Sequence, residues 1–114
     1  MASLAQIEAR VRAGITLLDR NIPGWWKESG VETHQRGVID LRKLNITSGS
    51  DCVLGQLFGS FDDGYESLRS KMLPNLTECD YGFDFDVLRD RGILNKLWYK
   101  HISERRQNAL RLAA

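Results

Sequence analysis

The stretch Ile39–Gly59, with the sequence IDLRKLNITSGSDCVLGQLFG, predicts the centre of the fold. Its start overlaps Val38–Ile46, whose mixed apolar and polar residues fit either a short extended run or a single helical turn. Ser48–Asp51 is rich in residues that cap helices, so we expect a helix to begin near Cys52. From Cys52 to Phe61 the chain has hardly any polar face. We therefore expect this helix to be buried, with other helices packed around it.

Two glycines lie within this predicted helix, and an acidic segment follows it. Gly55 and Gly59 are four residues apart and would share one helix face, where a second helix could pack closely. Asp62–Gly64 is expected to interrupt the helix. An amphipathic helix then resumes and ends before Pro74, with an apolar stripe formed by Tyr65, Leu68 and Met72.

The N-terminal segment predicts an amphipathic helix over Leu4–Arg20. Ser3 and Gln6 have the spacing of a capping box at its start. Gly14 interrupts an otherwise regular pattern, and we expect it to let another backbone approach closely. The apolar stripe of this helix consists of Leu4, Ile7, Val11, Ile15 and Leu18.

A second long helix is predicted from Val87 or Leu94 to Leu110. Its apolar stripe is formed by Leu94, Leu97, Trp98, His101 and Ile102, and its outward-facing cations are Lys96, Lys100, Arg105 and Arg106. His101 lies on the apolar side, where we expect a hydrogen-bonded boundary residue. With the central helix, these elements predict a mainly α, compact single-domain fold over residues 1–114. We expect four or five helices and one short extended segment.

Two adjacent tryptophans follow the turn at Pro23-Gly24. Neighbouring residues on a helix or a strand point in different directions, so one core is not expected to enclose both Trp25 and Trp26. The exposed one would be a candidate contact residue, because tryptophan is enriched at interface hot spots. The polar segment Lys27–Gly37 then predicts a loop, in which His34 is solvated.

Composition excludes several classes of protein. Hydrophobic residues make up 42% and charged residues 27% of the chain, as in an ordinary globular domain. No apolar run approaches the roughly 18 residues that a membrane span needs. The N-terminus lacks the apolar core of a secretory signal, so we expect a cytoplasmic protein. Cys52 and Cys79 are then expected to be free thiols in the core.

Motifs for catalysis and for cofactor binding are not recognisable. The sequence has no nucleophile elbow, phosphate-binding loop, dinucleotide fingerprint or zinc-binding helix, so we expect neither an enzyme nor a bound cofactor or metal. One alternative stays open, a small metal-dependent enzyme that uses an acidic cluster. The candidate carboxylates are those of Asp62, Asp63, Glu66, Asp84, Asp86 and Asp90.

The charge is unevenly distributed, although the net charge is only +1. Residues 62–90 contain eight acids and three bases, whereas the chain from Arg91 onward contains six bases and one acid. Cations suit the end of a helix, and this is the simplest explanation. The alternative is a nucleic-acid-associated regulator that binds phosphates through Lys96, Lys100, Arg105, Arg106 and Arg111.

Several segments together resemble a family of small uncharacterised proteins from actinobacteria and their bacteriophages. The most specific is the octet CVLGQLFG at Cys52–Gly59. The others are Pro23-Gly24-Trp25, the pattern from Ile39 to Ser48, the YGFD tetrad at residues 81–84, and Leu97-Trp98 with Arg105-Arg106. The Lys27–Gly37 loop is longer than this family leads us to expect. The resemblance implies no catalytic residues, but it implies a small accessory protein that binds a host or phage protein.

Our leading hypothesis is a non-enzymatic protein-interaction module, phage-encoded and located in the host cytoplasm. The predicted partner-binding residues are Trp25, Trp26, Lys96, Lys100, Arg105 and Arg106. A host or phage protein is the favoured partner, nucleic acid is second, and a membrane is not expected. Self-association stays open.

Overall fold

The computed structural model describes residues 3–28 and 37–113. Over these ranges the chain forms the α-helices α1 (Leu4–Asn21), α2 (Val53–Phe58), α3 (Phe61–Leu68) and α4 (Arg91–Ala113). Two short 3₁₀ turns, η1 (Arg69–Lys71) and η2 (Leu88–Asp90), extend α3 and precede α4. The described residues contain no β-strand. The predicted mainly α fold is therefore confirmed. For residues 38–46 we expected either a short extended run or a single turn, and the structure has a turn at residues 41–43 within irregular backbone and no strand among the described residues.

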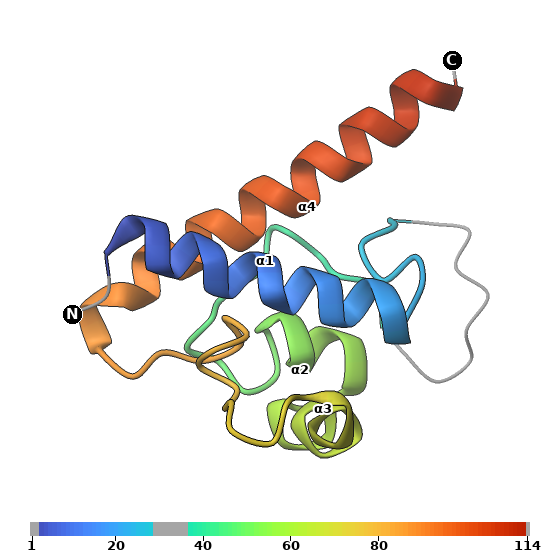
Figure 1. Ribbon diagram of the computed structural model, residues 1–114. Helices are drawn as coiled ribbons and strands as arrows, with labels where there is room; N and C mark the ends of the chain where they lie inside the picture. Colours follow the sequence, from blue (N-terminus) through green and yellow to red (C-terminus); the bar gives the residue numbers. More distant parts are fainter. Residues whose placement is uncertain (1–2, 29–36, 114) are drawn as a thin grey trace.

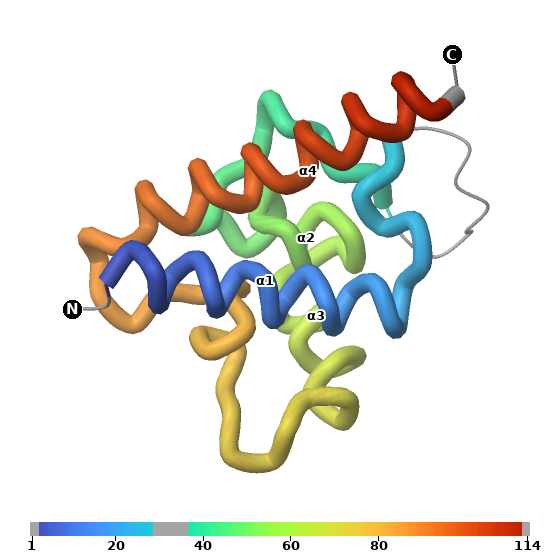
Figure 2. The backbone as a smooth tube through the Cα atoms, turned by 45° about the horizontal axis from the view of Figure 1, so that its top comes forward, coloured from blue at the N-terminus to red at the C-terminus, as the bar shows by residue number. Residues whose placement is uncertain are grey.

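The helices form two packed pairs. The two long helices, α1 and α4, lie side by side, and α2 and α3 form a second, shorter pair beneath them (Figures 1 and 2). The C-terminal end of α4 projects past the rest of the body, so the molecule measures 42 Å along its longest axis and 26 Å and 24 Å across it (Figure 1). Part of the surface of α4 is therefore left uncovered by the body.

Large aromatic rings form the centre of the core. The edge of Trp25 meets the Trp98 ring, with ring centroids 6.0 Å apart, and Phe83 stacks on Trp98 at 5.5 Å. The Trp98 Nε1–H donates to the backbone oxygen of Gly82 at 2.6 Å, so the buried indole keeps a hydrogen-bond partner. Burying three such rings supplies a large share of the hydrophobic stabilisation of a chain this short.

Gly14 fits α1 closely against the rest of the core. A Cβ at this position would clash with the carbonyl oxygen of Tyr81 and would come within 3.0 Å of the Trp98 ring. The expectation that Gly14 admits a close backbone neighbour is confirmed. The capping box at the start of α1 is confirmed as well, because Ser3 and Gln6 exchange backbone-to-side-chain hydrogen bonds.

The central helix is shorter than predicted. It has six residues, and its N-cap is Cys52, whose Sγ accepts a hydrogen bond from the Gly55 N–H at 3.3 Å. Gly55 packs against the backbone of Gly49 and Ser50, and Gly59 is an exposed C-cap with a φ of 96°. The predicted shared face of Gly55 and Gly59 for a second helix is therefore wrong. The positive φ at Gly59 ends the helix before such a face can form.

The next helix also begins earlier than predicted. Ser60 caps α3 by accepting a hydrogen bond from the Asp63 N–H, and Asp62 and Asp63 lie in its first turn. These acids therefore start a helix instead of interrupting one. The favourable interaction of carboxylates with the positive end of a helix dipole accounts for their position.

Candidate functional site

Two adjoining hollows lie along roughly the last three turns of α4. They have volumes of about 550 and 200 Å³ and share Glu28, Arg106 and Leu110 as lining residues. We refer to both together as the α4 groove. The larger hollow is completed by residues 38–42, Ser103 and Gln107, and the smaller one by Trp26, Lys27 and Ala109.

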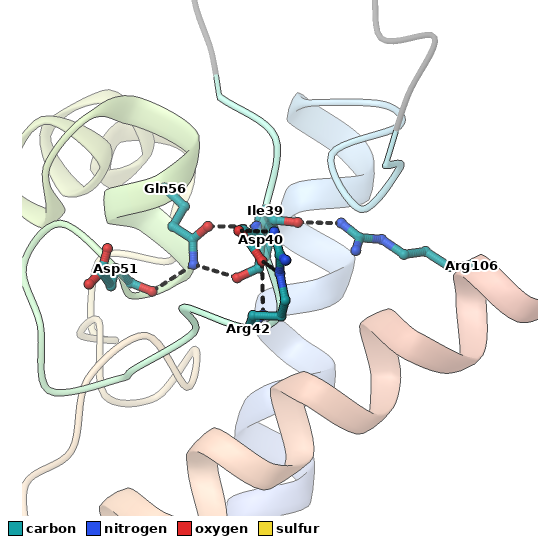
Figure 3. A network of polar contacts seen from close by, with 6 residues as sticks. All are labelled: Ile39, Asp40, Arg42, Asp51, Gln56 and Arg106. Carbon is teal, nitrogen blue, oxygen red and sulfur yellow. Dashed lines mark hydrogen bonds and ion pairs between the residues drawn. The ribbon is translucent and has the colours of Figure 1, made fainter.

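Arg106 holds the two backbone segments that flank the groove. Its Nε donates to the backbone oxygen of Trp26 at 2.8 Å, and its Nη2 donates to the backbone oxygen of Ile39 at 2.6 Å (Figure 3). Both acceptors are neutral. No carboxylate of the described residues forms an ion pair with Arg106. The guanidinium therefore fixes the shape of the groove, and Glu28 is the acidic residue among the described ones that lines both hollows with it.

Gln56 holds residues 38–42 from the other side. Its Oε1 accepts from the Asp40 N–H at 2.6 Å, and its Nε2 donates to the backbone oxygens of Asp40 and Asp51 (Figure 3). Hydrogen bonds from the side chain and backbone of Arg42 lower the pKa of Asp40, so this carboxylate is ionised and neutralised by its neighbour. One wall of the groove is therefore fixed by hydrogen bonds to both α2 and α4.

Apolar side chains are exposed along the groove. Leu110 is 72% exposed and Val38 is 44% exposed. Trp26 is half-buried, and the ammonium of Lys27 lies 5.9 Å from the centroid of its ring. A rigid concave surface that combines an indole with exposed aliphatic side chains is suited to contact with another apolar surface.

Trp25 and Trp26 have different environments, as expected. Trp25 is fully buried against Trp98, and its Nε1–H donates to Asp19 at 2.9 Å. Trp26 lines the groove. Of the two, only Trp26 is placed to contact a partner, and Trp25 positions the backbone that leads to it.

The outward orientation predicted for Arg105 and Arg106 is wrong. Arg105 forms two hydrogen bonds with the carboxylate of Asp19, at 2.6 and 2.8 Å, and Arg106 holds the groove backbone. Burial by itself raises the pKa of Asp19, but the hydrogen bonds from Arg105 and Trp25, together with the charge of Arg105, outweigh it and lower the pKa. The reason is the tertiary packing, which places the C-terminal end of α1 beside this turn of α4.

Lys96 and Lys100 are exposed, as predicted, and they share the outer face of α4 with Arg111. None of the three forms an ion pair within residues 3–28 and 37–113. We refer to them as the basic ridge. The loop predicted at Lys27–Gly37, including His34, falls largely on residues 29–36, which lie outside the described residues.

The other titratable groups show little that is typical of catalysis. Desolvation raises the pKa of Cys52, and burial followed by the charge of Asp84 raises that of Cys79 to about 11, so neither thiol is an activated nucleophile at neutral pH. Both are free thiols; Cys52 is buried as expected, whereas Cys79 is only half-buried. His101 is paired with Glu8 at 2.9 Å, which confirms its boundary role. No three His, Cys, Asp or Glu residues among those described are grouped to hold a metal ion.

Sequence reasoning missed Gln56 and Leu110 as groove residues, and it predicted Arg106 as an outward-facing cation that contacts a partner, not as the residue that holds the groove backbone. Gln56 and Arg106 act through backbone partners distant in sequence, and no local pattern signals such contacts. Leu110 did carry a signal, because an aliphatic residue near the polar end of an amphipathic helix indicates exposed apolar surface.

Comparisons with known proteins assign no family. No protein-family model, curated protein or solved structure matches the chain. Within the described residues, no helix has the length and apolar character that a membrane crossing requires. The groove geometry therefore provides the basis for a functional assignment.

Proposed function

We propose that the chain is a non-enzymatic protein-interaction module whose contact surface is the α4 groove. Its ligand is an apolar segment of a host or phage protein, consistent with a phage-encoded accessory protein in the host cytoplasm. The observation that carries this proposal is the exposure of Leu110, which lines one hollow with Val38 and the adjoining hollow with Trp26. Exposed apolar surface of this kind costs solubility unless a partner covers it.

The chemistry of the groove also indicates what the partner segment contains. An aliphatic or aromatic side chain would contact Trp26 and Leu110, which lie in the same hollow. Arg106 forms no ion pair with a carboxylate of the described residues, and its positive charge favours a carboxylate of the partner next to that side chain. Because hydrogen bonds already fix Arg106 and residues 38–42, little conformational entropy is lost on binding.

The test is affinity capture from an actinobacterial host lysate with tagged protein, in the presence of nuclease, read by mass spectrometry. The variant Leu110→Gln removes an exposed leucine from the groove, and glutamine keeps the helix propensity. Leu73→Gln is the matched control, because Leu73 is an exposed leucine (59%) that does not line the groove. We expect one dominant protein that Leu110→Gln loses and Leu73→Gln retains.

Purified partner then gives the quantitative test. We expect Leu110→Gln and Trp26→Ala each to weaken binding at least tenfold in calorimetry, since groove anchors carry most of the energy of such contacts. Equal losses for Leu110→Gln and Leu73→Gln would refute the groove as the contact surface. Retention of the partner by all three variants would refute it as well.

A second candidate is a nucleic-acid-associated regulator that binds through the basic ridge. It is favoured by one observation: three exposed cations on one face of α4 form no ion pair with any of the residues that the structure describes. The ridge differs from the set expected from sequence, since Arg105 and Arg106 make intramolecular contacts. This candidate would be favoured if nuclease abolished the capture and if the affinity fell steeply with added salt. The affinity should then fall further in the triple variant Lys96→Gln/Lys100→Gln/Arg111→Gln.

A further inference from the structure

A separate hollow of about 370 Å³ forms where three segments distant in sequence meet. Its lining consists of residues 46–50 with Cys52, the start of α3 at residues 60–62, and residues 83–85. We refer to it as the phenylalanine–carboxylate pocket. It shares no lining residue with the α4 groove. Its volume falls within the range of about 300–1,000 Å³ that is typical of small-ligand sites.

Three phenylalanine rings line this pocket, and packing fixes two of them. Phe83 is buried and stacks on Trp98. Phe61 is half-buried and stacks on Tyr65, with an angle of 2° between the ring planes. Phe85 is half-buried as well. The faces of aromatic rings attract cations, and the attraction strengthens as the site excludes water.

The charged residues of the pocket are both acidic. Asp62 and Asp84 line it, and no lysine or arginine is among its lining residues. Within the described part of the chain, neither carboxylate forms an ion pair. The Oδ1 of Asp84 accepts a hydrogen bond from the Phe85 N–H at 2.8 Å, so this carboxylate is held next to the Phe85 backbone. The pocket therefore combines two carboxylates that form no ion pair among the described residues with aromatic surface, and the positive end of α3 offsets part of the charge of Asp62.

We propose that the phenylalanine–carboxylate pocket binds an organic cation, an ammonium or guanidinium group on an apolar stem. The rings contact the stem and the cationic head, and Asp62 and Asp84 supply the counter-charge. Anions are disfavoured by the same two carboxylates. Among the described residues, no group of three His, Cys, Asp or Glu side chains is placed to hold a metal ion, so the two carboxylates of the pocket are not supported by a further ligand of these types. The head group could belong to a free small molecule or to an arginine of another protein.

The first test uses the unmodified chain and small probes. ¹⁵N-labelled protein is titrated with butylguanidinium and butylammonium at constant ionic strength, and the amide signals of Gly49, Phe61 and Asp84 are followed. We expect saturable shifts at these amides. 1-Butanol and butyrate keep the stem without the cation, and we expect neither to saturate the site. Absence of saturation by both cations in the tens of millimolar range, or equal shifts from 1-butanol, would overturn the proposal.

Variants locate the site. Asp62→Asn/Asp84→Asn removes both carboxylates and should weaken cation binding at least tenfold, whereas Asp63→Asn, an adjacent residue outside the pocket lining, should leave it unchanged. Equal weakening by Asp63→Asn would show a general charge effect and overturn the assignment. If the double variant fails to fold, Phe85→Leu replaces it, because the loss of a half-buried ring face should also weaken binding measurably.

A comparison of two synthetic peptides tests whether the cation belongs to a protein segment or to a free small molecule. A capped peptide Ala-Leu-Arg-Leu-Ala is compared with the same peptide carrying citrulline, a neutral isostere, in place of arginine. Tighter binding of the arginine peptide than of butylguanidinium would identify a protein segment, and the reverse order a free cation. Equal binding of the arginine and citrulline peptides would contradict the proposal. Because the α4 groove is not involved, failure here leaves the proposed function untouched.

Discussion

Both halves of α4 carry large apolar residues, but the surroundings of these residues differ. In the first half, Leu94, Trp98 and Ile102 are fully buried in the core. In the second half, Leu110 and Leu112 are 72% and 88% exposed. The change occurs where α1 ends at Asn21, because from there α4 contacts the body through guanidinium groups and loop backbone.

This comparison teaches that apolar spacing predicts a helix face but not what covers it. The first half is stabilised mainly by the burial of apolar side chains, which does not depend on the ionisation of a carboxylate. The second half is held by directional hydrogen bonds to carboxylate and carbonyl oxygens. We therefore expect substitutions in the first half to change the stability of the fold, and substitutions in the second half to change binding.

The largest effect is expected in the first half. Trp98→Ala removes the ring that contacts Trp25 and Phe83 and should lower the free energy of unfolding by about 3–5 kcal/mol, measured by urea denaturation. Tyr99→Ala, at the next and exposed position, should cost about 0.5 kcal/mol or less. Similar losses for the two variants would contradict the buried assignment of this half.

A smaller effect tests how closely α1 approaches α4. Gly14→Ala places a methyl group against the Tyr81 carbonyl and the Trp98 ring, and the overpacking should destabilise the fold by about 1–3 kcal/mol. Gly92→Ala, in α4, meets nothing within 4 Å and should instead stabilise by up to about 1 kcal/mol, because alanine favours the helix. Thermal unfolding of both variants should therefore show shifts of opposite sign. A stabilising Gly14→Ala would show that the two helices are not in close contact there.

The ion pair at the boundary of the two halves should contribute less than about 1 kcal/mol, because the side chains of Arg105 and Asp19 are 35% and 38% exposed. The lowered pKa of Asp19 means that this stabilisation is present at neutral pH and is lost as the pH falls through the folded-state pKa, below about pH 4. Urea denaturation should therefore show a difference between the parent and Arg105→Gln at pH 7 that vanishes in strong acid. Arg111→Gln is the control, and no such pH dependence is expected for it. If the difference in the free energy of unfolding between the parent and Arg105→Gln stayed constant with pH, the ion pair would be excluded as its cause.

The smallest effect on stability is expected in the second half. Leu112→Gln should change the free energy of unfolding by no more than about 0.5 kcal/mol, since the side chain is almost fully exposed. The same change at the buried residue Leu94 should cost several kilocalories per mole by chemical denaturation, because it buries an amide in the core. If Leu112→Gln were as destabilising as Leu94→Gln, the contrast between the halves would be wrong.

Local patterns in the sequence were sufficient for the long helices. The spacing of apolar residues located both, and the Ser3–Gln6 pair gave the first residue of α1. The bounds of the second were less accurate, because α4 runs from Arg91 to Ala113 and the prediction began at Val87 or Leu94 and ended at Leu110. The adjacency of Trp25 and Trp26 was enough to predict that their burial differs. These features depend on periodicity and on neighbours within one turn, so the sequence carries them directly.

Long-range contacts were not predictable in this way. Arg105 and Arg106 look like solvated cations in a helix, yet their partners lie 86, 80 and 67 residues away. The cap of α2 was equally hidden, because a cysteine thiol replaces the usual serine or aspartate oxygen. The groove and the phenylalanine–carboxylate pocket consist of such non-local juxtapositions, so neither could be built before the fold was known.

The two hydrogen bonds of Arg106 have a consequence for how the walls of the α4 groove depend on each other. They tie the backbone at Trp26 and at Ile39 to the same guanidinium group, so both anchor points are set by α4. Loss of this one side chain would therefore release both backbone segments together, and the shape of the groove depends on a single residue of α4.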